Sequence, residues 1–415
     1  MSEKAKEPVI RFKGFSEEWE ERKLGDLMEV TSVKRIHQSD WTDSGVRFLR
    51  ARDIVAESKN EEISEPLFIS WEKYDEYSAI SGKVKIGDLL VTGVGTIGVP
   101  MLINSDESLY FKDGNIIWFK NENAIDGRFF YYSFNGCNIQ KFIKESAGIG
   151  TVGTYTIESG KKTPINLPQQ KEEQQKIGSY FRQLDRLITL YQRKYNKLTS
   201  VKKSMLQKMF PASGQTKPAL RFAGFTDKWE VRKLGEVAKE IKRTDETSNA
   251  PVMMITAENG FINQSERYST NNAGESLKKY ILLEKGELAY NHGASKLRPY
   301  GSCFSLTTEE KARIPFVYHC FSSDSENAEF LSIALNGKAV ESQLRRIVSS
   351  GARMDGLLNI SFQEYTSIPI LLPERAEQDK IANYFRQLDH LIALHQQELQ
   401  KLQNLKKACL KKMFV

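Results

Sequence analysis

The 415-residue sequence has few cysteines, no long hydrophobic run and no recognisable catalytic motif. Its four cysteines, Cys137, Cys303, Cys320 and Cys409, form no Cys-x-x-Cys pair, so we expect reduced thiols in a cytoplasmic protein. The five histidines lack metal-ligand spacing. The least polar stretch, residues 89–103, contains three glycines and a proline and is too short to cross a membrane. These absences argue against a disulfide-rich, metal-binding or membrane-spanning protein.

Two segments look like nucleotide-binding loops but lack the required context. Residues 93–98 fit the pattern G-x-G-x-x-G after an expected strand, but Pro100 and an apolar segment follow where a dinucleotide site needs a helix. Residues 160–163 read GKKT without the earlier glycine of a P-loop. Neither an Asn/Asp-Pro-Pro-Tyr methyltransferase signature nor paired carboxylates beside a lysine are found. We expect no active site and no cofactor or metal in this chain, and residues 93–98 to form a hairpin or a phosphate-contacting strand end.

What the sequence does contain is a repeat. The hexapeptide YFRQLD occurs at residues 180–185 and again at 384–389, and the eleven-residue segments that begin there agree at nine positions. A second block beginning at Pro8 matches one beginning at Pro218, with eleven identities in nineteen positions. The chain is therefore a tandem duplication, and its function is expected to be carried out twice.

Two basic segments, residues 169–210 and 373–415, are predicted to form long helices that pack on each other. They carry net charges of +7 and +3, whereas the remaining residues sum to −3. Their apolar residues recur at alternating steps of four and three, as in a coiled coil. We expect packing contacts from Ile177, Phe181, Leu184, Ile188, Ile381, Phe385, Leu388 and Ile392. Both seams are expected to slip by one residue after Leu198 and Leu402, to Val201 and Leu405. A proline, Pro168 or Pro373, should end the strand before each helix.

The two segments between these landmarks are predicted to be mixed and strand-rich. Residues 85–92 and 285–291 look like equivalent strands, and residues 129–136 and 330–337 like equivalent short helices that end at Asn-Gly. Outside these elements the two segments differ strongly, although their frames are nearly identical. This pattern indicates two copies of one fold adapted to different ligands.

Several polar and basic stretches are candidates for nucleic-acid contacts. Residues 47–52 alternate arginine with apolar residues, so one face of a strand would carry cations toward phosphates or guanine edges. Two loops of the second repeat are rich in polar and basic residues, where the first repeat has Lys144. Each of these side chains alone is more often a solvated surface residue, but together they favour a polar binding face in each domain. The candidates are Arg47, Arg50, Arg52, Thr92, Gly93, Gly95, Thr96, Lys144, Asn291, His292, Ser295, Lys296, Arg298, Arg345, Arg346 and Arg353.

Three motifs give the chain a resemblance to a known family. They are RFxGFxxxWExRKLG at the start of both repeats, GDLLVTGVGTIG in the first globular segment, and LPxxxEQxKIxxYFRQLDxLI at both helix starts. Over essentially its whole length the chain resembles the specificity subunit of type I restriction–modification enzymes. The resemblance implies an α+β fold with two similar α/β target-recognition domains, separated by two long antiparallel coiled-coil helices in a pseudo-two-fold tandem repeat. The expected segments are residues 1–166 (first domain), 167–212 (central helix and linker), 213–370 (second domain) and 371–415 (distal helix).

The same resemblance implies a non-catalytic subunit that recognises double-stranded DNA. Each globular domain would read one half of a bipartite site, while the helices set the spacing and dock two adenine-N6 methyltransferase subunits. Two restriction subunits would join as motor-nucleases, and S-adenosylmethionine, ATP and Mg²⁺ would bind to these partners, not to this chain. Two alternatives remain open on the sequence alone. One is an interaction protein that scaffolds partners without binding DNA, which the near-neutral globular segments favour; the other is a stand-alone DNA enzyme.

Overall fold

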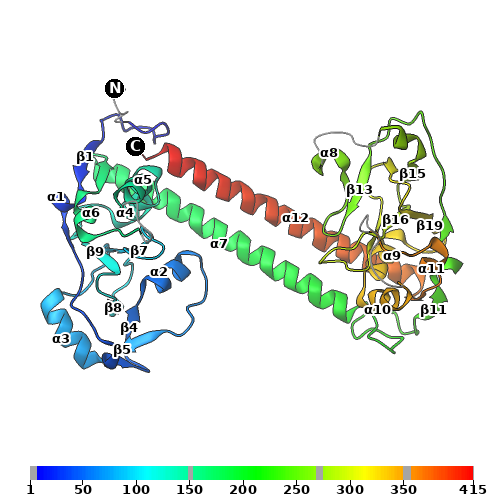
Figure 1. The fold of residues 1–415 in the computed structure, drawn as a ribbon, viewed down its shortest axis with the longest axis horizontal. Coiled ribbons are helices and arrows are strands. Elements are labelled where there is room, and N and C mark those ends of the chain that lie inside the picture. The colour runs from blue at the N-terminus through cyan, green and yellow to red at the C-terminus, as the bar shows by residue number, and fades with distance from the viewer. Residues whose placement is uncertain (1–6, 148–152, 268–273, 349–356, 415) are drawn as a thin grey trace. The chain divides into compact units, whose positions relative to one another are not determined.

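The structure is a computed structural model that describes residues 7–147, 153–267, 274–348 and 357–414. The chain forms two compact units (Figure 1). Unit 1 comprises residues 1–193 and 396–415, and unit 2 comprises residues 194–395. Each unit therefore combines one globular domain with about half of each long helix.

The two long helices have the same length and the same kind of start. Helix α7 spans Lys171–Lys208 and helix α12 spans Arg375–Lys412, each with 38 residues. The strands before them, β10 (Pro164–Leu167) and β20 (Pro369–Leu372), end at Pro168 and Pro373, as predicted. Acidic residues occupy each first turn and lysines each last turn, which complements the helix macrodipole.

Within each unit the two helices run antiparallel. In unit 1 the Asp185 carboxylate lies 2.6 Å from the Lys406 ammonium group, and the rings of Phe181 and Phe414 are 5.6 Å apart. In unit 2 Lys202 pairs with Asp389, and Phe210 contacts Phe385. In each unit, residues further along α7 therefore lie opposite residues that come earlier in α12. The antiparallel arrangement of the two helices is confirmed.

The predicted slip of the seam was wrong in α12. Of the eight expected packing residues, Ile188 and Ile392 are half-buried and the other six are buried. Beyond Leu402, however, Leu405 is 44% exposed, and Cys409 and Met413 are buried. The seam therefore continues in heptad steps through Lys406, and Lys202 holds the equivalent position in α7. The spacing of apolar residues could not reveal this position, because a lysine occupies it.

The globular domain of unit 1 contains two four-stranded sheets (Figure 1). The first is antiparallel, with the order β2 (Glu29–Thr31), β9 (Ile116–Lys120), β6 (Leu89–Thr92), β7 (Pro100–Leu102). The second has the order β3 (Trp41–Thr42), β5 (Leu67–Ile69), β4 (Val46–Leu49), β8 (Leu109–Phe111), in which β4 and β8 are parallel. Strand β1 (Glu20–Lys23) pairs with β10. The helices are α1 (Leu24–Leu27), α2 (Ala51–Ser58), α3 (Trp71–Ser81), α4 (Gly127–Phe134), α5 (Cys137–Ser146) and α6 (Ile157–Lys162), with the 3₁₀ turn η1 (Gln38–Asp40).

Within its described residues, the globular domain of unit 2 repeats the first sheet of unit 1, and its other strands form two-stranded pairs. Its four-stranded antiparallel sheet has the order β12 (Lys239–Glu240), β19 (His319–Ser322), β16 (Leu288–Asn291), β17 (Ser302–Ser305). The two-stranded pairs are β11 (Glu230–Lys233) with β20, β13 (Met253–Thr256) with β14 (Gly260–Asn263), and β15 (Ile281–Glu284) with β18 (Lys311–Ile314). The helices are η2 (Leu234–Glu236), α8 (Gln264–Arg267), η3 (Gly274–Lys279), α9 (Ala328–Leu335), α10 (Lys338–Ile347) and α11 (Phe362–Thr366). The expected equivalence of the strand and helix landmarks is thus confirmed.

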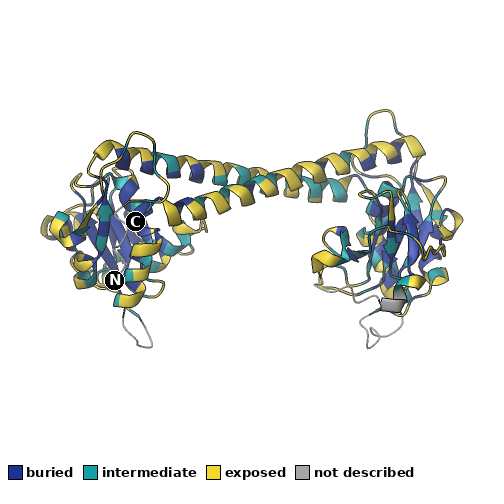
Figure 2. Cartoon of the chain, turned by 90° about the horizontal axis from the view of Figure 1, so that it is seen from above, coloured by how far each residue is buried: buried dark blue, intermediate teal, exposed yellow. Residues whose placement is uncertain are grey.

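Each core receives aromatic residues from both long helices. In unit 1, Phe129 on α4 contacts Phe414, which follows the end of α12, and Phe414 in turn contacts Phe181 on α7. In unit 2, Phe330 on α9 stacks on Phe210, which follows the end of α7. Figure 2 shows buried residues concentrated in the globular domains, whereas the long helices expose much of their surface. The end of each repeat's helix therefore completes the core of the other repeat's domain.

The repeated Glu-Gln pair at each helix start joins the domain to its helix. Glu173, which is 1% exposed, accepts hydrogen bonds from the Arg11 guanidinium, and the Gln174 side chain accepts the backbone N–H of Asp126. In unit 2, Glu377 and Gln378 do the same with Arg221 and Asn327. Ion pairs buried in this way require both partners, because a single buried charge is costly. The duplicated motif is therefore structural in both units.

Candidate nucleic-acid interface

The glycine-rich segment of unit 1 forms a hairpin at one end of the first sheet. Strand β6 ends at Thr92, whose buried hydroxyl donates to the Thr96 carbonyl at 2.5 Å and accepts from the Val99 N–H. Gly95 has a φ of +69° and is exposed together with Thr96 at the tip. Because β7 follows and pairs antiparallel with β6, a dinucleotide-binding helix is excluded and the expected hairpin is confirmed. Thr92 lies in the interior, so only the tip faces solvent.

Gly93 joins this hairpin to two other segments through its backbone. Its N–H donates to the Asn115 carbonyl at 2.8 Å, and its carbonyl accepts the Tyr155 N–H at 2.9 Å. A Cβ atom at Gly93 would lie 2.6 Å from the Tyr155 carbonyl oxygen, so no other residue fits here without a backbone shift. The Gly93 amide is therefore occupied inside the protein and is not directed at solvent.

Helix α5 places a lysine beside the hairpin. Gln140 donates from its side chain to the Gly98 carbonyl at 2.8 Å, and the Ile143 side chain lies against Gly98. The last turn of α5, with the exposed Lys144, is consequently next to the hairpin. Helix α10 is the equivalent of α5 and carries the exposed Arg345 and Arg346 in its last turn. A favourable interaction with the helix macrodipole accounts for cations at these positions even without a ligand.

In unit 2, five of the predicted residues lie at the end of β16 and in its connection to β17, and the structure separates them into two groups. The Ser295 N–H donates to the Arg298 carbonyl and the Ser295 hydroxyl accepts the Arg298 N–H, in a turn that exposes Ser295 and Lys296. Asn291 instead donates to the Ile255 carbonyl and accepts from the Gly293 N–H. His292 is buried between backbone carbonyls.

Arg298 belongs to the interior group as well. Its guanidinium donates to the Asn336 carbonyl at the end of α9 at 2.6 Å, and burial lowers the pKa of this guanidinium. Arg353, the remaining candidate of this domain, lies outside the described residues. The exposed candidates of the second domain are therefore Ser295, Lys296, Arg345 and Arg346.

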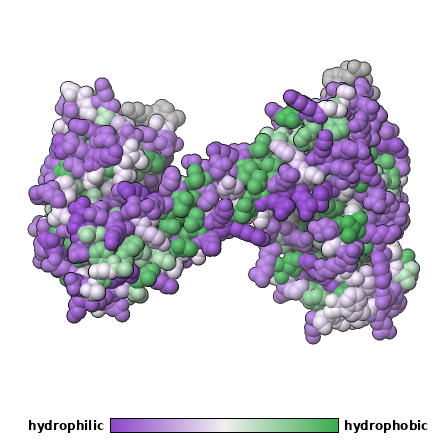
Figure 3. All heavy atoms as spheres, turned by 180° about the vertical axis from the view of Figure 1, so that it is seen from behind, coloured by the Kyte–Doolittle hydropathy of each residue, from purple (hydrophilic) through white to green (hydrophobic). Residues whose placement is uncertain are grey.

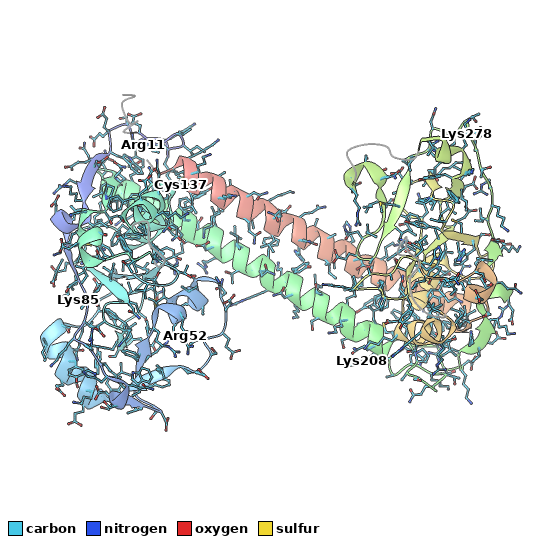
Figure 4. All side chains as sticks on the ribbon, viewed as in Figure 1. Arg11, Arg52, Lys85, Cys137, Lys208 and Lys278 are labelled. Atoms are coloured by element: carbon cyan, nitrogen blue, oxygen red, sulfur yellow. The ribbon has the colours of Figure 1, made fainter. Side chains whose placement is uncertain are left out.

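The expected strand face of arginines at residues 47–52 does not exist. Strand β4 ends at Leu49 and α2 begins at Ala51, so only Arg47 is on a strand, half-buried and 3.5 Å from Glu57. The Arg50 guanidinium makes two hydrogen bonds to Asp53 and one to the Glu65 carbonyl, which fixes it to the start of α2. Arg52 is the exposed member of the three, on the first turn of α2 (Figure 4). The prediction failed because the helix start changes the direction in which successive side chains point.

Two exposed apolar residues near the candidate edge of unit 2 were missed. Leu297 is 56% exposed between Lys296 and Arg298, and Phe316 is 51% exposed in the connection between β18 and β19. Apolar side chains at a DNA-contacting edge can pack against thymine methyl groups. In the sequence, Leu297 could have been noticed as a leucine between two cations in an otherwise polar loop.

The buried Cys303 thiol is held in its neutral form. Burial raises the pKa of the Cys303 thiol to about 12, so this group is not a nucleophile near neutral pH. Among the residues placed by the structure, no group of three or more His, Cys, Asp or Glu side chains is arranged to hold a metal ion. No helix within the same ranges is long and apolar enough to cross a bilayer.

Comparison with known proteins decides the family. Residues 16–200 and 226–404 each match the type I restriction modification DNA specificity domain. The chain belongs to this family. It is a DNA specificity subunit of a type I restriction–modification system, non-catalytic, with two target-recognition domains. The resemblance seen in the sequence, the α+β fold with two such domains and the paired helices are confirmed.

Individual relatives agree with this assignment. A putative type I restriction enzyme specificity subunit of Haemophilus influenzae is 30% identical over 169 residues, which cover 40% of each chain. The putative MjaX specificity subunit of Methanocaldococcus jannaschii is 22% identical over 423 residues, which cover 94% of this chain and 91% of the relative. The crystal structure of a type I S subunit from M. genitalium shares the fold, with a TM-score of 0.57 and 16% identity over 99% of both chains. At such identities the contacts to individual bases do not transfer from one specificity subunit to another.

Proposed function

We propose that each domain of this specificity subunit reads one half of a bipartite site in double-stranded DNA with the loop edge at the end of β6 or β16. The supporting observation is that both domains have this edge in equivalent elements, but with different exposed side chains. In the first domain it presents a small tip, Gly95 and Thr96, beside Lys144. In the second it presents Ser295 and Lys296, and Arg345 and Arg346 lie on the equivalent helix. Cations position the protein on phosphates, while the differing polar groups distinguish bases.

The two long helices are proposed to set the spacing of the half-sites and to dock two methyltransferase subunits. Four leucines on their surface support the docking role. Leu187 and Leu190 on α7 are 41% and 46% exposed, and the equivalent Leu391 and Leu394 on α12 are 40% and 44% exposed. Figure 3 shows apolar surface along the helix pair. Equivalent apolar surfaces in two repeats suit two identical partners, as expected for a pseudo-two-fold scaffold.

The remaining partners follow from the proposed assembly. Two restriction subunits would join the methyltransferase subunits to cleave unmodified DNA in the cytoplasm. S-adenosylmethionine would bind to the methyltransferase subunits, and ATP and Mg²⁺ to the motor-nuclease subunits. The specificity subunit would supply the DNA sequence preference of the whole complex.

The test is an exchange of domains followed by sequencing of methylated DNA. Residues 20–166 are replaced by the corresponding segment of a related specificity subunit, and the adenine-methylated motif of the host genome is determined. One half of the motif is expected to change while the other half and the gap stay the same. A matched exchange of residues 230–370 should change the other half. If either exchange altered both halves together, independent reading by the two domains would be refuted.

A binding experiment separates this function from a scaffold without DNA contact. The full chain with its methyltransferase partner is tested by gel shift on a duplex containing the motif and on a duplex with one base changed in each half-site. Loss of a good base contact is expected to cost about 1–3 kcal/mol of binding free energy. Equal binding to all duplexes, or none, would favour the scaffold.

A further inference from the structure

The side of α7 that points away from its packing seam carries a row of arginines in unit 1. Arg182, Arg186 and Arg193 follow one another at steps of four and seven residues, and all three are exposed. At about 100° of rotation per residue, the three side chains fall within about 40° of arc, opposite the buried Leu184. The helical rise spreads them over about 16 Å. One side of the helix therefore presents three cations in line.

Arg128 on α4 extends this row toward the globular domain. A Cβ atom at Gly178 on α7 would lie 2.8 Å from the Arg128 Cβ atom, so the two helices touch at this point. Gly178 lies about one turn before Arg182, and the exposed Arg128 is therefore beside the beginning of the row. Arg128, Arg182, Arg186 and Arg193 together form the basic face of unit 1.

The guanidinium groups of the basic face form no ion pair with any residue that the structure describes. Two carboxylates of the same region are engaged elsewhere. Asp126 accepts backbone N–H groups at the start of α4. Asp185 is bound to Lys406 and to the Tyr132 hydroxyl. Like charges four residues apart on a helix repel each other, so an anionic ligand would relieve this repulsion.

The equivalent face of unit 2 has a different charge. Its four positions hold one acid, one arginine and two uncharged residues, which are Glu329, Arg386, His390 and Gln397. Glu329 on α9 forms an ion pair with Arg386 at 3.1 Å, so the arginine of this face is already paired. With a neutral histidine the four positions carry no net charge, whereas the four arginines of the basic face carry +4. The two helices share the hexapeptide YFRQLD, so the difference in charge is local.

The basic face suits a polyanion that meets the chain once. Two identical protein subunits require equivalent surfaces in the two repeats, but the charge of the basic face is present in one repeat only. DNA is the polyanion that a DNA specificity subunit must meet. A guanidinium group matches a phosphate with a planar fork of N–H donors. Contacts of this kind hold the duplex without reading its sequence.

We propose that the basic face of unit 1 binds the phosphate backbone beside the first half-site and anchors the duplex there independently of its base sequence. This inference rests on the proposed function, because it takes the first domain to hold one of the two half-sites. The corresponding positions of unit 2 supply no such anchor. The DNA is therefore held more firmly on the side of the first half-site.

The experiment measures DNA affinity as a function of salt for the full chain with its methyltransferase partner. The alanine variant combines Arg182→Ala, Arg186→Ala and Arg193→Ala. If each arginine contacts one phosphate, the slope of log affinity against log salt should fall by about 2.7. An increase from about 50 mM to 200 mM salt should then weaken the wild type about fortyfold more than the variant. Discrimination against a changed base should stay the same in both proteins.

Two further variants serve as controls. Lysine at the same three positions keeps the charges, so the salt slope should return close to that of the wild type. The matched control on α12 combines Arg386→Ala and Lys401→Ala, because both cations are held by glutamates of this chain. Its salt slope is expected to remain close to that of the wild type.

Neutral methylphosphonate linkages locate the contact on the DNA. The half-sites are first assigned to domains by the exchange of residues 20–166. Neutral linkages beside the first half-site should weaken binding of the wild type but have little effect on the alanine variant. The same linkages beside the second half-site should weaken both proteins equally.

Three results would overturn the inference. An unchanged salt slope in the alanine variant would leave the arginines as solvated surface cations. Loss of base discrimination would make them base-reading residues. Loss of the methyltransferase subunit from the variant, seen by sedimentation, would show that the basic face binds protein and not DNA. Failure of the proposed function is a separate outcome, because it would appear as an exchange of residues 20–166 that changes neither half-site.

Discussion

The Asp185 carboxylate on α7 has two partners: it forms an ion pair with the Lys406 ammonium group at 2.6 Å and accepts a hydrogen bond from the Tyr132 hydroxyl at 2.7 Å. Lys406 also lies over the Tyr132 ring, 5.7 Å from its centroid. The equivalent Asp389 pairs with Lys202, but the place of Tyr132 is taken by Ile333, which has no hydroxyl to donate. Both repeats therefore have the ion pair between the two helices. Only in the first repeat does a residue of the globular domain, Tyr132, also donate a hydrogen bond to the aspartate.

Asp185→Ala is expected to destabilise the protein more than Asp389→Ala. The first substitution leaves the Tyr132 hydroxyl without its acceptor, at a cost of about 1–3 kcal/mol of unfolding free energy. The second removes only a partly exposed ion pair, worth about 0–1 kcal/mol. Urea denaturation of both variants measures the difference. Equal midpoints would show that the hydroxyl finds another partner in the variant.

The stability of the second domain is expected to fall on acidification because of His319. Its pKa is lowered in the folded protein, mainly by burial, so the unfolded chain takes up this proton more readily. The stabilising contribution is therefore complete above about pH 6.5 and is lost as the pH falls below that value. His319→Ile, which copies Ile117 of the first domain, should remove this part of the acid destabilisation. Thermal unfolding followed between about pH 7 and pH 5 tests it; an unchanged pH profile would mean that His319 is not responsible.

Arg345 and Arg346 are expected to contribute to DNA affinity through phosphate contacts. If both contact phosphates, replacing the pair by alanine should weaken binding to all duplexes alike and reduce the slope of log affinity against log salt by about two. Lys338→Ala, an exposed lysine at the opposite end of α10, is the matched control. A selective loss at a single base position would instead assign these arginines to base recognition.

The length of the helices is expected to set the unread gap between the half-sites. Four residues are inserted into α7 between Asp185 and Lys202 and four into α12 between Asp389 and Lys406, which preserves both ion pairs. The insertion adds about 6 Å and a net rotation of about 40°. One base pair adds about 3.4 Å and about 35° of turn. A recognition domain must face the correct groove of the DNA, so the added rotation matters more than the added length. We therefore predict a gap longer by one base pair, with both half-sites unchanged.

The control for this insertion replaces four residues of each helix in the same interval by alanine without changing its length. Sequencing of methylated DNA gives the motif for both proteins. An active insertion variant with the original gap would show that the helices do not determine the spacing.

The sequence by itself determined the duplication, the two long helices, the sheet landmarks and the family. These features depend on local patterns, since heptad spacing, prolines before helices and repeated motifs are read along the chain. Even the anchoring role of Glu173 and Gln174 was marked by their repetition at Glu377 and Gln378. The pattern could not show that Arg11 is the partner of Glu173, because the two residues are 162 positions apart.

Only the tertiary structure decided which polar residues face solvent and which lie inside. Arg50 and Arg298 are cationic side chains like Lys296, but the first is fixed by Asp53 and the second by the Asn336 carbonyl. Lys406 occupies a seam position because a carboxylate from the opposing helix meets it there. The place of a polar side chain depends on partners distant in the sequence, since a buried polar group is tolerated only where another part of the chain satisfies its hydrogen bonds.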